Sequence, residues 1–257
     1  MCIRDRLSVN LAGGTLTLSA VNTYTGTTTV TNGTLLVNGS LAAGSVVTIG
    51  GSGVLGGAGT IGSPVTVQAG GMLSPGGVLS TLTFTNNLTL AAGSSSFFEI
   101  SKSPTTNDVA KVSGLLTCGG TLIVTNISGP APVAGDSFKL FTAGSYGGAF
   151  DRVQLPPLSV GLAWNTSALN TNGTVSVMVT PHPVVGSAKI FNSGLVFNGN
   201  SGVGYASYYL LGSTNLATPV SNWMRLLTNQ FDATGNFSFT NPINPSWPQT
   251  YYRMQIP

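Results

Sequence analysis

Apolar residues alternate with threonine, serine and asparagine over most of the first hundred residues of the chain. The alternation has a period of two, as a β-strand with one buried face requires. It recurs in the short segments Leu16-Thr17-Leu18, Leu35-Leu36-Val37, Val47-Thr48-Ile49, Val65-Thr66-Val67, Leu82-Thr83-Phe84 and Leu88-Thr89-Leu90. Glycine-rich turns such as 50–53 and 56–59 separate these segments. Strands this short cannot each bury a face alone, so the pattern predicts a stack of coils, a β-solenoid.

A second pattern is a glycine followed by threonine or methionine and then an aliphatic residue. It occurs at Gly14-Thr15-Leu16, Gly33-Thr34-Leu35, Gly59-Thr60-Ile61, Gly71-Met72-Leu73, Gly120-Thr121-Leu122 and Gly173-Thr174-Val175. The first four are 19, 26 and 12 residues apart, which predicts corner loops of variable length between aligned strands. An antiparallel sandwich is the structural alternative, although its solvent face would usually carry more charge and its hairpin turns would be clearer.

Charge is missing from the same region. None of the 92 residues from Leu7 to Phe98 is Asp, Glu, Lys, Arg or His. Equivalent positions of stacked coils lie ~4.8 Å apart, where like charges repel and Thr, Ser or Asn form hydrogen-bonded ladders. In-register parallel stacking therefore explains the depletion. The stretch alone also cannot supply a general acid or base, or a carboxylate site for a metal ion.

The whole chain of 257 residues has 6% charged residues, against roughly 25% in a typical soluble domain. Its net charge of +3 and pI of about 9.0 come from 9 basic and 6 acidic residues. The basic residues form no cluster after the first six positions, so nucleic-acid binding is not expected. Mean hydropathy is +0.31, yet no apolar run approaches the ~18 residues of a spanning helix, so no transmembrane segment is expected.

The N-terminal segment 1–6, with the sequence MCIRDR, has three charges in six residues and matches nothing after it. We expect it to be non-native and exclude it from the fold. No signal peptide is visible, and we expect the chain to be a fragment of a longer protein. Without Cys2, Cys118 is a single thiol, and we expect a packed small hydrophobe instead of a nucleophile.

Residues 14–35, GTLTLSAVNTYTGTTTVTNGTL, closely resemble the autotransporter-associated, or passenger-associated, β-strand repeat. The ordered Asn-Thr-Tyr-Thr-Gly core at residues 22–26 makes the resemblance specific, and a looser similarity continues to about residue 100. The resemblance implies a right-handed parallel β-helix that is secreted or exposed at a bacterial surface. Proteins of this kind present passenger domains and are not defined by a catalytic motif.

Changes in composition divide the rest of the chain. We expect β-helix coils over 7–125, terminal coils and a cap over 126–180, and a linker at 181–183, where two prolines flank His182. Residues 184–257 are expected to form a small antiparallel β-sandwich. They resemble a C-terminal module of secreted proteins from Verrucomicrobia-like bacteria, through the residues Tyr208–Leu216, Trp223, Phe231–Phe237 and Tyr251–Met254.

Candidate chemistry is sparse, and we predict no catalytic, cofactor-binding or metal-ligating residue. His182 is expected to be part of the linker, and Asp136 and Asp232 are expected to start turns, with calcium binding as the alternative. The candidates for glycan binding are aromatic: Trp164, Trp223, Trp247, Tyr208, Tyr251 and Tyr252. Of these we select Trp223 and Tyr251; the alternative is that Trp223 and Tyr209 fill the core of the C-terminal unit.

Three functional classes follow. The sequence favours a non-catalytic, adhesin-like surface protein that acts as a passenger or spacer. The alternative is a carbohydrate-binding accessory protein whose partner is a surface glycan or another surface polymer. A polysaccharide lyase or hydrolase is the third class, and it would require Asp108, Asp136 or Asp151 to meet in one cleft. The ligand, the export route and the oligomeric state stay open.

Overall fold

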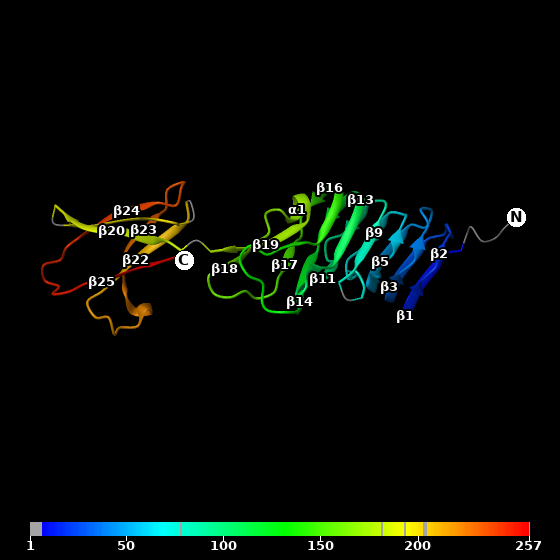
Figure 1. Cartoon of the computed structure of the whole chain (residues 1–257), viewed down its shortest axis with the longest axis horizontal. Coiled ribbons are helices and arrows are strands. Elements are labelled where there is room, and N and C mark those ends of the chain that lie inside the picture. Colours follow the sequence, from blue (N-terminus) through cyan, green and yellow to red (C-terminus); the bar gives the residue numbers. More distant parts are fainter. Residues whose placement is uncertain (1–6, 78, 181, 193, 203–204, 257) are drawn as a thin grey trace. The chain divides into compact units, whose positions relative to one another are not determined.

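The computed structural model of the chain describes residues 7–256 except 78, 181, 193 and 203–204. The chain divides into two compact units, Met1–Val179 and Thr180–Pro257, and each is described by itself (Figure 1). The predicted non-native segment 1–6, which includes Cys2, lies outside the described residues. In the part of the chain that is described, no helix has both the length and the apolar composition that crossing a membrane requires.

The first unit is built almost entirely of strands, most of which join one 16-stranded sheet. Every strand pair in that sheet is parallel except β11 with β12. Its strands are β1 (Val9–Leu18), β2 (Val21–Asn22), β3 (Thr28–Val37), β4 (Ser40–Leu41), β5 (Val47–Gly56), β6 (Thr60–Ile61), β7 (Val65–Val67), β8 (Met72–Leu73), β9 (Thr81–Phe84), β10 (Leu88–Leu90), β11 (Ser95–Lys102), β12 (Thr105–Asn107), β13 (Val109–Cys118), β14 (Thr121–Ser128), β16 (Phe141–Gly148) and β17 (Arg152–Gln154).

Strands far apart in the sequence lie side by side in a regular order. Val9 pairs with Thr28, and Thr28 pairs with Val47, so the chain returns to the same place after 19 residues. The short strands make a second parallel row, in the order β2–β4–β6–β9. The sequence-based prediction of an all-β fold dominated by parallel stacking is therefore confirmed.

The pairing corrects one expectation from the sequence. Gly59-Thr60-Ile61 does not belong with the other early glycine repeats, because Thr60 pairs with Ser40 in the row of short strands. The true successor of Gly33-Thr34-Leu35 is Gly53-Val54-Leu55, followed by Gly71-Met72-Leu73. The repeat is therefore nearly regular, and the irregular spacing came from mixing two rows. Gly173-Thr174-Val175 lies outside the parallel sheet, at the start of an antiparallel strand.

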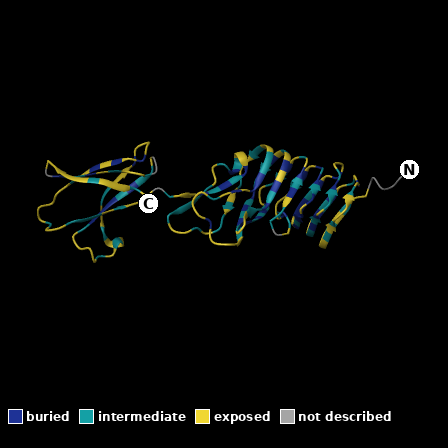
Figure 2. Cartoon of the chain, in the orientation of Figure 1, coloured by how far each residue is buried: buried dark blue, intermediate teal, exposed yellow. Residues whose placement is uncertain are grey.

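Inward-facing side chains of successive strands stack in columns that form the core. Leu35 pairs with Leu55, Leu55 pairs with Leu73, and all three are 0% exposed. The buried residues follow the strands of this unit in Figure 2. Alternation with a period of two therefore places one face of each strand on a shared core, which a single strand of this length could not form alone.

The outward face carries a ladder of threonines in register. Thr29 pairs with Thr48, Thr48 with Thr66, Thr66 with Thr89, and Thr89 with Thr117. Each is half-buried, between the buried residues on either side of it in the chain. The expected alignment of like polar residues is thus confirmed, and at this spacing a column of charges would repel itself.

One end of the parallel sheet adjoins a small antiparallel sheet and a short helix. The sheet has the order β15–β19–β18, with β15 (Ser137–Lys139), β18 (Leu162–Asn165) and β19 (Thr174–Val179), and the helix is α1 (Leu169–Asn172). Phe138, Leu169 and Val175 from these elements are buried in the same core cluster as the parallel strands.

The second unit contains two three-stranded antiparallel sheets, ordered β20–β21–β24 and β23–β22–β25. Both sheets contribute to one aromatic core, in which the ring of Tyr208 lies 5.7 Å from that of Phe237 and 6.3 Å from that of Phe239. The elements are β20 (Val184–Phe191), β21 (Gly194–Asn200), β22 (Ser207–Ser213), the 3₁₀ turn η2 (Val220–Asn222), β23 (Met224–Gln230), β24 (Phe237–Pro242) and β25 (Tyr251–Gln255).

Close approach of neighbouring strands gives a stability prediction. A Cβ added to Gly59 would lie 2.1 Å from the carbonyl oxygen of Gly39, whereas one added to Gly13 would meet nothing within 4 Å. We expect Gly59→Ala to lower the free energy of unfolding by about 1–3 kcal/mol, because the stacked backbones must separate. Gly13→Ala, the matched control, should be neutral or slightly stabilising. Urea unfolding followed by circular dichroism measures both; equal effects would contradict the close-approach argument.

Candidate functional site

The six aromatic candidates are distributed over both units. Trp164 lies in β18, where its Nε1 donates to the carbonyl oxygen of Pro156 at 2.8 Å. Tyr208 is 0% exposed in the core of the second unit. Tyr252 packs on the same core, with its ring 5.1 Å from that of Phe197. Trp247 is half-buried in the loop before β25. Tyr208 therefore fills the core, and Trp164 and Tyr252 are also packed against core residues.

Trp223 and Tyr251 come together at one end of the sheet β23–β22–β25. Tyr251 pairs with Ser213 of β22, and Gly212 pairs with Met224, so Trp223 directly precedes β23 on the other side of Ser213. Both aromatic residues are half-buried. The indole Nε1 of Trp223 donates to the carbonyl oxygen of Thr218 at 2.8 Å, which fixes the ring against the η2 loop. Glycan binding by these two residues stays a prediction.

The face of β22 that looks away from the core carries further polar and aromatic groups. Tyr208 and Leu210 belong to the core cluster, so alternation turns Tyr209, Leu211 and Ser213 to the opposite face. We call this the outer face of the sheet β23–β22–β25. The alternative that Tyr209 fills the core is therefore wrong: its neighbour Tyr208 does so.

Two arginines lie on the outer face, and sequence reasoning missed them. Leu211 pairs with Arg225 of β23 on one side and with Arg253 of β25 on the other. The Cζ atom of Arg225 lies 3.6 Å from the ring centroid of Tyr209, a cation–π contact. Period two places Arg253 on the same face as Tyr251 from the sequence alone, but only the strand pairing brings Arg225 to the same row.

The carboxylates of the first unit hold its backbone. Asp108 is 1% exposed, and its two oxygens accept hydrogen bonds from the N–H groups of Ser80 and Glu99, each at 2.8 Å. Burial raises its pKa to about 6, against the lowering effect of these two hydrogen bonds, and the nearby Glu99 carboxylate adds to the rise. Asp151 accepts from the N–H of Gly120 at 3.0 Å.

Asp136 is held in an ion pair. Its carboxylate lies 2.5 Å from Nζ of Lys102 and also accepts the N–H of Val133 at 2.6 Å. Partial burial acts to raise the pKa of Asp136, but the hydrogen bonds from Lys102 and Val133 and the Lys102 charge outweigh it and lower the pKa. Asp108, Asp136 and Asp151 are thus each engaged by different partners, and the described residues contain no group of three or more His, Cys, Asp or Glu arranged to hold a metal ion.

Asp232 organises a turn in the second unit. Its carboxylate accepts hydrogen bonds from the backbone N–H groups of Thr234 and Asn236 and from both of their side chains, at 2.8–3.1 Å. The N–H of Asn236 and the hydroxyl of Thr234 are the main causes that lower its pKa to about 2. The expected turn-starting role is seen here, because the loop's own donors fill the carboxylate.

Two further groups that sequence analysis considered for chemistry are placed by the structure. His182 is exposed, and its Nδ1 lies 2.6 Å from the carbonyl oxygen of Thr180. Cys118 is 4% exposed in the core of the first unit, and burial raises the pKa of its thiol to about 11. A thiol with that pKa is almost wholly protonated near neutral pH, so it is a poor nucleophile.

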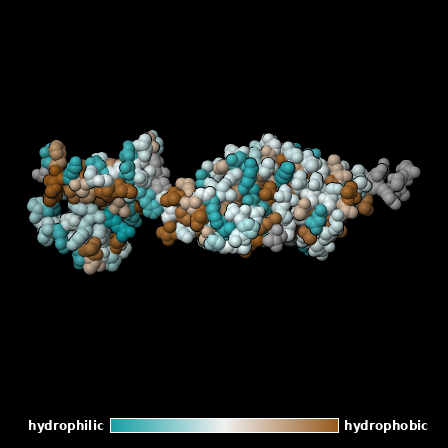
Figure 3. All heavy atoms as spheres, viewed as in Figure 1, coloured by the Kyte–Doolittle hydropathy of each residue, from teal (hydrophilic) through white to brown (hydrophobic). Residues whose placement is uncertain are grey.

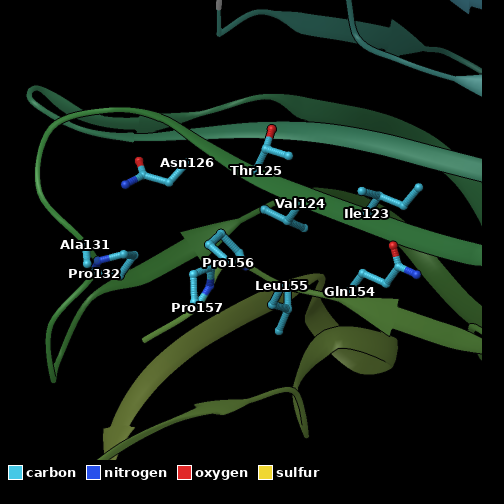
Figure 4. Close-up of a pocket in the computed structure, with 10 residues that line it drawn as sticks. All are labelled: Ile123, Val124, Thr125, Asn126, Ala131, Pro132, Gln154, Leu155, Pro156 and Pro157. Atoms are coloured by element: carbon cyan, nitrogen blue, oxygen red, sulfur yellow. The ribbon is translucent and has the colours of Figure 1, made fainter. Parts of the chain in front are cut away.

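The first unit also has an open pocket of about 550 Å³ (Figure 4). Its lining has no ionisable side chain; it consists of Ile123, Val124, Thr125, Asn126, Ala131, Pro132, Gln154, Leu155, Pro156 and Pro157. Such a lining offers apolar contact and neutral hydrogen bonds, but no acid or base for catalysis.

The comparisons with known proteins add no relative. No family profile matches this chain, and no curated protein matches it in a sequence search. The arguments for function therefore depend on the residues and their geometry.

The raised pKa of Asp108 gives a pH prediction. Because its pKa of about 6 in the fold exceeds the ordinary 3.8, its contribution to stability is complete below about pH 3.8 and is lost as the pH rises through about 6. This carboxyl should lower the free energy of unfolding by up to about 3 kcal/mol over that interval. Asp108→Asn should remove that fall.

Urea unfolding at about pH 4 and about pH 7 measures the difference between wild type and variant. Asp232→Asn is the matched control, because both its folded pKa of about 2 and the ordinary value of 3.8 lie below this interval. An unchanged pH dependence in Asp108→Asn would show that this carboxyl does not carry the effect.

Proposed function

We propose that the first unit is a right-handed parallel β-helix and that the chain is a non-catalytic structural protein of a bacterial surface or of the extracellular space. In this role the β-helix is an adhesin-like passenger or spacer, residues 126–180 complete and cover its stack, and residues 184–257 form an attached β-sandwich module. The observation that carries the proposal is the in-register parallel pairing repeated every 19 residues from Val9 to Thr28 to Val47.

The glycine contacts support a helical stack of coils. Glycines recur where one strand crosses close to the backbone of the preceding one, as Gly59 does over Gly39 and Gly39 does over Ala20. The backbone N–H of Thr60 donates to the carbonyl oxygen of Gly39 at 2.9 Å, and that of Ser40 donates to Ala20 at 3.1 Å. Each coil therefore hydrogen-bonds to its predecessor along the same row, as in a repeat protein whose units contact only their neighbours.

The use of the charged groups supports a structural role. Four carboxylates, those of Asp108, Asp136, Asp151 and Asp232, bind backbone N–H groups. Much of the visible surface of the first unit in Figure 3 is pale, between hydrophilic and hydrophobic, because it consists largely of small neutral residues. A surface like this separates or displays other parts without chemistry of its own. The location outside the cell rests on the resemblance of residues 14–35 to the passenger-associated repeat.

Removal of one repeat tests the coil. Deleting residues 28–46 joins Thr27 to Val47, and β5 should then pair with β1 in the register that β3 had. We expect the shortened protein to keep its β-type circular dichroism and to protect the amides of β5 from hydrogen exchange, because neighbouring repeats contribute independently. Deleting only β3, residues 28–37, removes half a repeat and should disrupt the stack. Equal behaviour of the two deletions would count against the β-helix.

Location is tested on intact cells of the organism that carries the chain. Added protease should degrade the protein, or the medium should contain it, while a cytoplasmic marker stays intact. Protection of the protein until the cells are lysed would overturn the surface role.

A further inference from the structure

The outer face of the sheet β23–β22–β25 combines cations and aromatic rings in a way that stacking forbids in the first unit. Arg225 and Arg253 both lie directly opposite Leu211, one on each neighbouring strand. Directly opposite residues of antiparallel strands point to the same face, and two strand spacings separate their backbones by about 10 Å. The face therefore presents two guanidinium groups in one row across a sheet.

Both guanidinium groups lack an acidic partner. Among the described residues the one salt bridge joins Lys102 to Asp136, and neither arginine forms a hydrogen bond with a side chain or carbonyl there. Both arginines are exposed. Asp232 is the single acidic residue of the second unit, and its own turn occupies its carboxylate. The donors of both arginines are thus available to an external anion.

Neighbouring side chains make the site more than a pair of charges. The ring of Tyr209 lies under Arg225, with 3.6 Å between its centroid and Cζ, and this contact orients the guanidinium plane. Tyr251 pairs with Ser213 at the next outward position of β22, two residues beyond Leu211. An aromatic ring there offers an apolar surface with a polar tip, which suits a sugar ring.

We infer that this outer face binds an acidic polysaccharide, with Arg225 and Arg253 each pairing with a carboxylate of uronic-acid residues and Tyr251 stacking on a sugar. A guanidinium group pairs with a carboxylate through two parallel hydrogen bonds, which favours arginine over lysine at such a site. An open sheet face with two cations about 10 Å apart suits an extended polymer with charges along its length.

A polysaccharide fits better than a nucleic acid. The second unit has three basic residues, Lys189, Arg225 and Arg253, and phosphate backbones are bound by stripes of many cations. The inference goes beyond the proposed scaffold role and does not depend on it. The deletions described above alter the first unit, while this binding test alters the second, so the two can fail separately.

The test measures binding of the full-length chain to polygalacturonate by biolayer interferometry. We expect binding that weakens as salt is raised, and weak or no binding to methyl-esterified polygalacturonate, whose sugars are the same but uncharged. The double variant Arg225→Gln/Arg253→Gln should lose about tenfold or more in affinity. Lys189→Gln, the matched control on the exposed strand β20, removes the same charge and should stay within about twofold.

Further variants separate folding from binding. Arg253→Gln breaks no contact within the described structure, so it should keep the wild-type melting temperature and still bind more weakly. Tyr251→Ala should lower the affinity by about threefold or more, whereas Tyr251→Phe, which keeps the ring, should not.

Several outcomes would overturn the inference. These are no binding to polygalacturonate, equal binding to its methyl ester, and an effect of Lys189→Gln as large as that of the double variant. Tighter binding of dextran sulfate would reassign the site to sulfated polymers, and tighter binding of single-stranded DNA would reassign it to nucleic acid.

Discussion

Backbone hydrogen bonding between parallel strands in register is the constraint on which the first unit depends. It brings each residue to within ~4.8 Å of its equivalent in the next strand, so the same side-chain type must be tolerable next to itself many times. Threonine satisfies this along the row from Thr29 to Thr117, and leucine satisfies it along Leu35, Leu55 and Leu73. Glycine satisfies it where backbones approach most closely, as at Gly59. Charged residues do not satisfy it.

The same constraint explains where the few acids are placed. The parallel stack from Leu7 to Phe98 has none, and the first, Glu99, comes near the end of β11. Beyond it the strands lengthen, and an antiparallel pair forms between β11 and β12. Asp108 follows that pair and binds two backbone N–H groups that strand pairing leaves free. A buried carboxylate is costly, and its raised pKa of about 6 reflects that cost.

The sequence predicts the first unit well because one local signal carries most of its fold. Period two and the glycine corners indicate parallel stacking before any contact is known. The assignment of Gly59-Thr60-Ile61 to the wrong row shows the limit of that signal: two rows use the same local sequence, and only Thr60 pairing with Ser40 separates them. Local sequence records which residues turn, but not which strand they meet.

The outer face of the second unit was harder to predict for two physical reasons. Adjacent tyrosines, Tyr208 and Tyr209, leave the parity of β22 undecided until the core is known. A register shift opposite Leu210 and Leu211 then adds Leu226 to β23, which brings Arg225 to the same row as Leu211. Sequence analysis selected Trp223 and Tyr251 by residue type, and the arginines depend on pairing that no local pattern contains.

The two units therefore answer one electrostatic problem in different ways. In a stack of coils a charge at one position is repeated against its like at the strand spacing, so the surface stays neutral. In the sheet β23–β22–β25 the two arginines are two strands apart with Leu211 between them, a separation of about 10 Å at which salt screens most of their repulsion. An antiparallel sheet without sequence repeats can thus carry cations that a repeating parallel sheet cannot. Recognition of a charged polymer, if this chain performs it, belongs on the second unit for that reason.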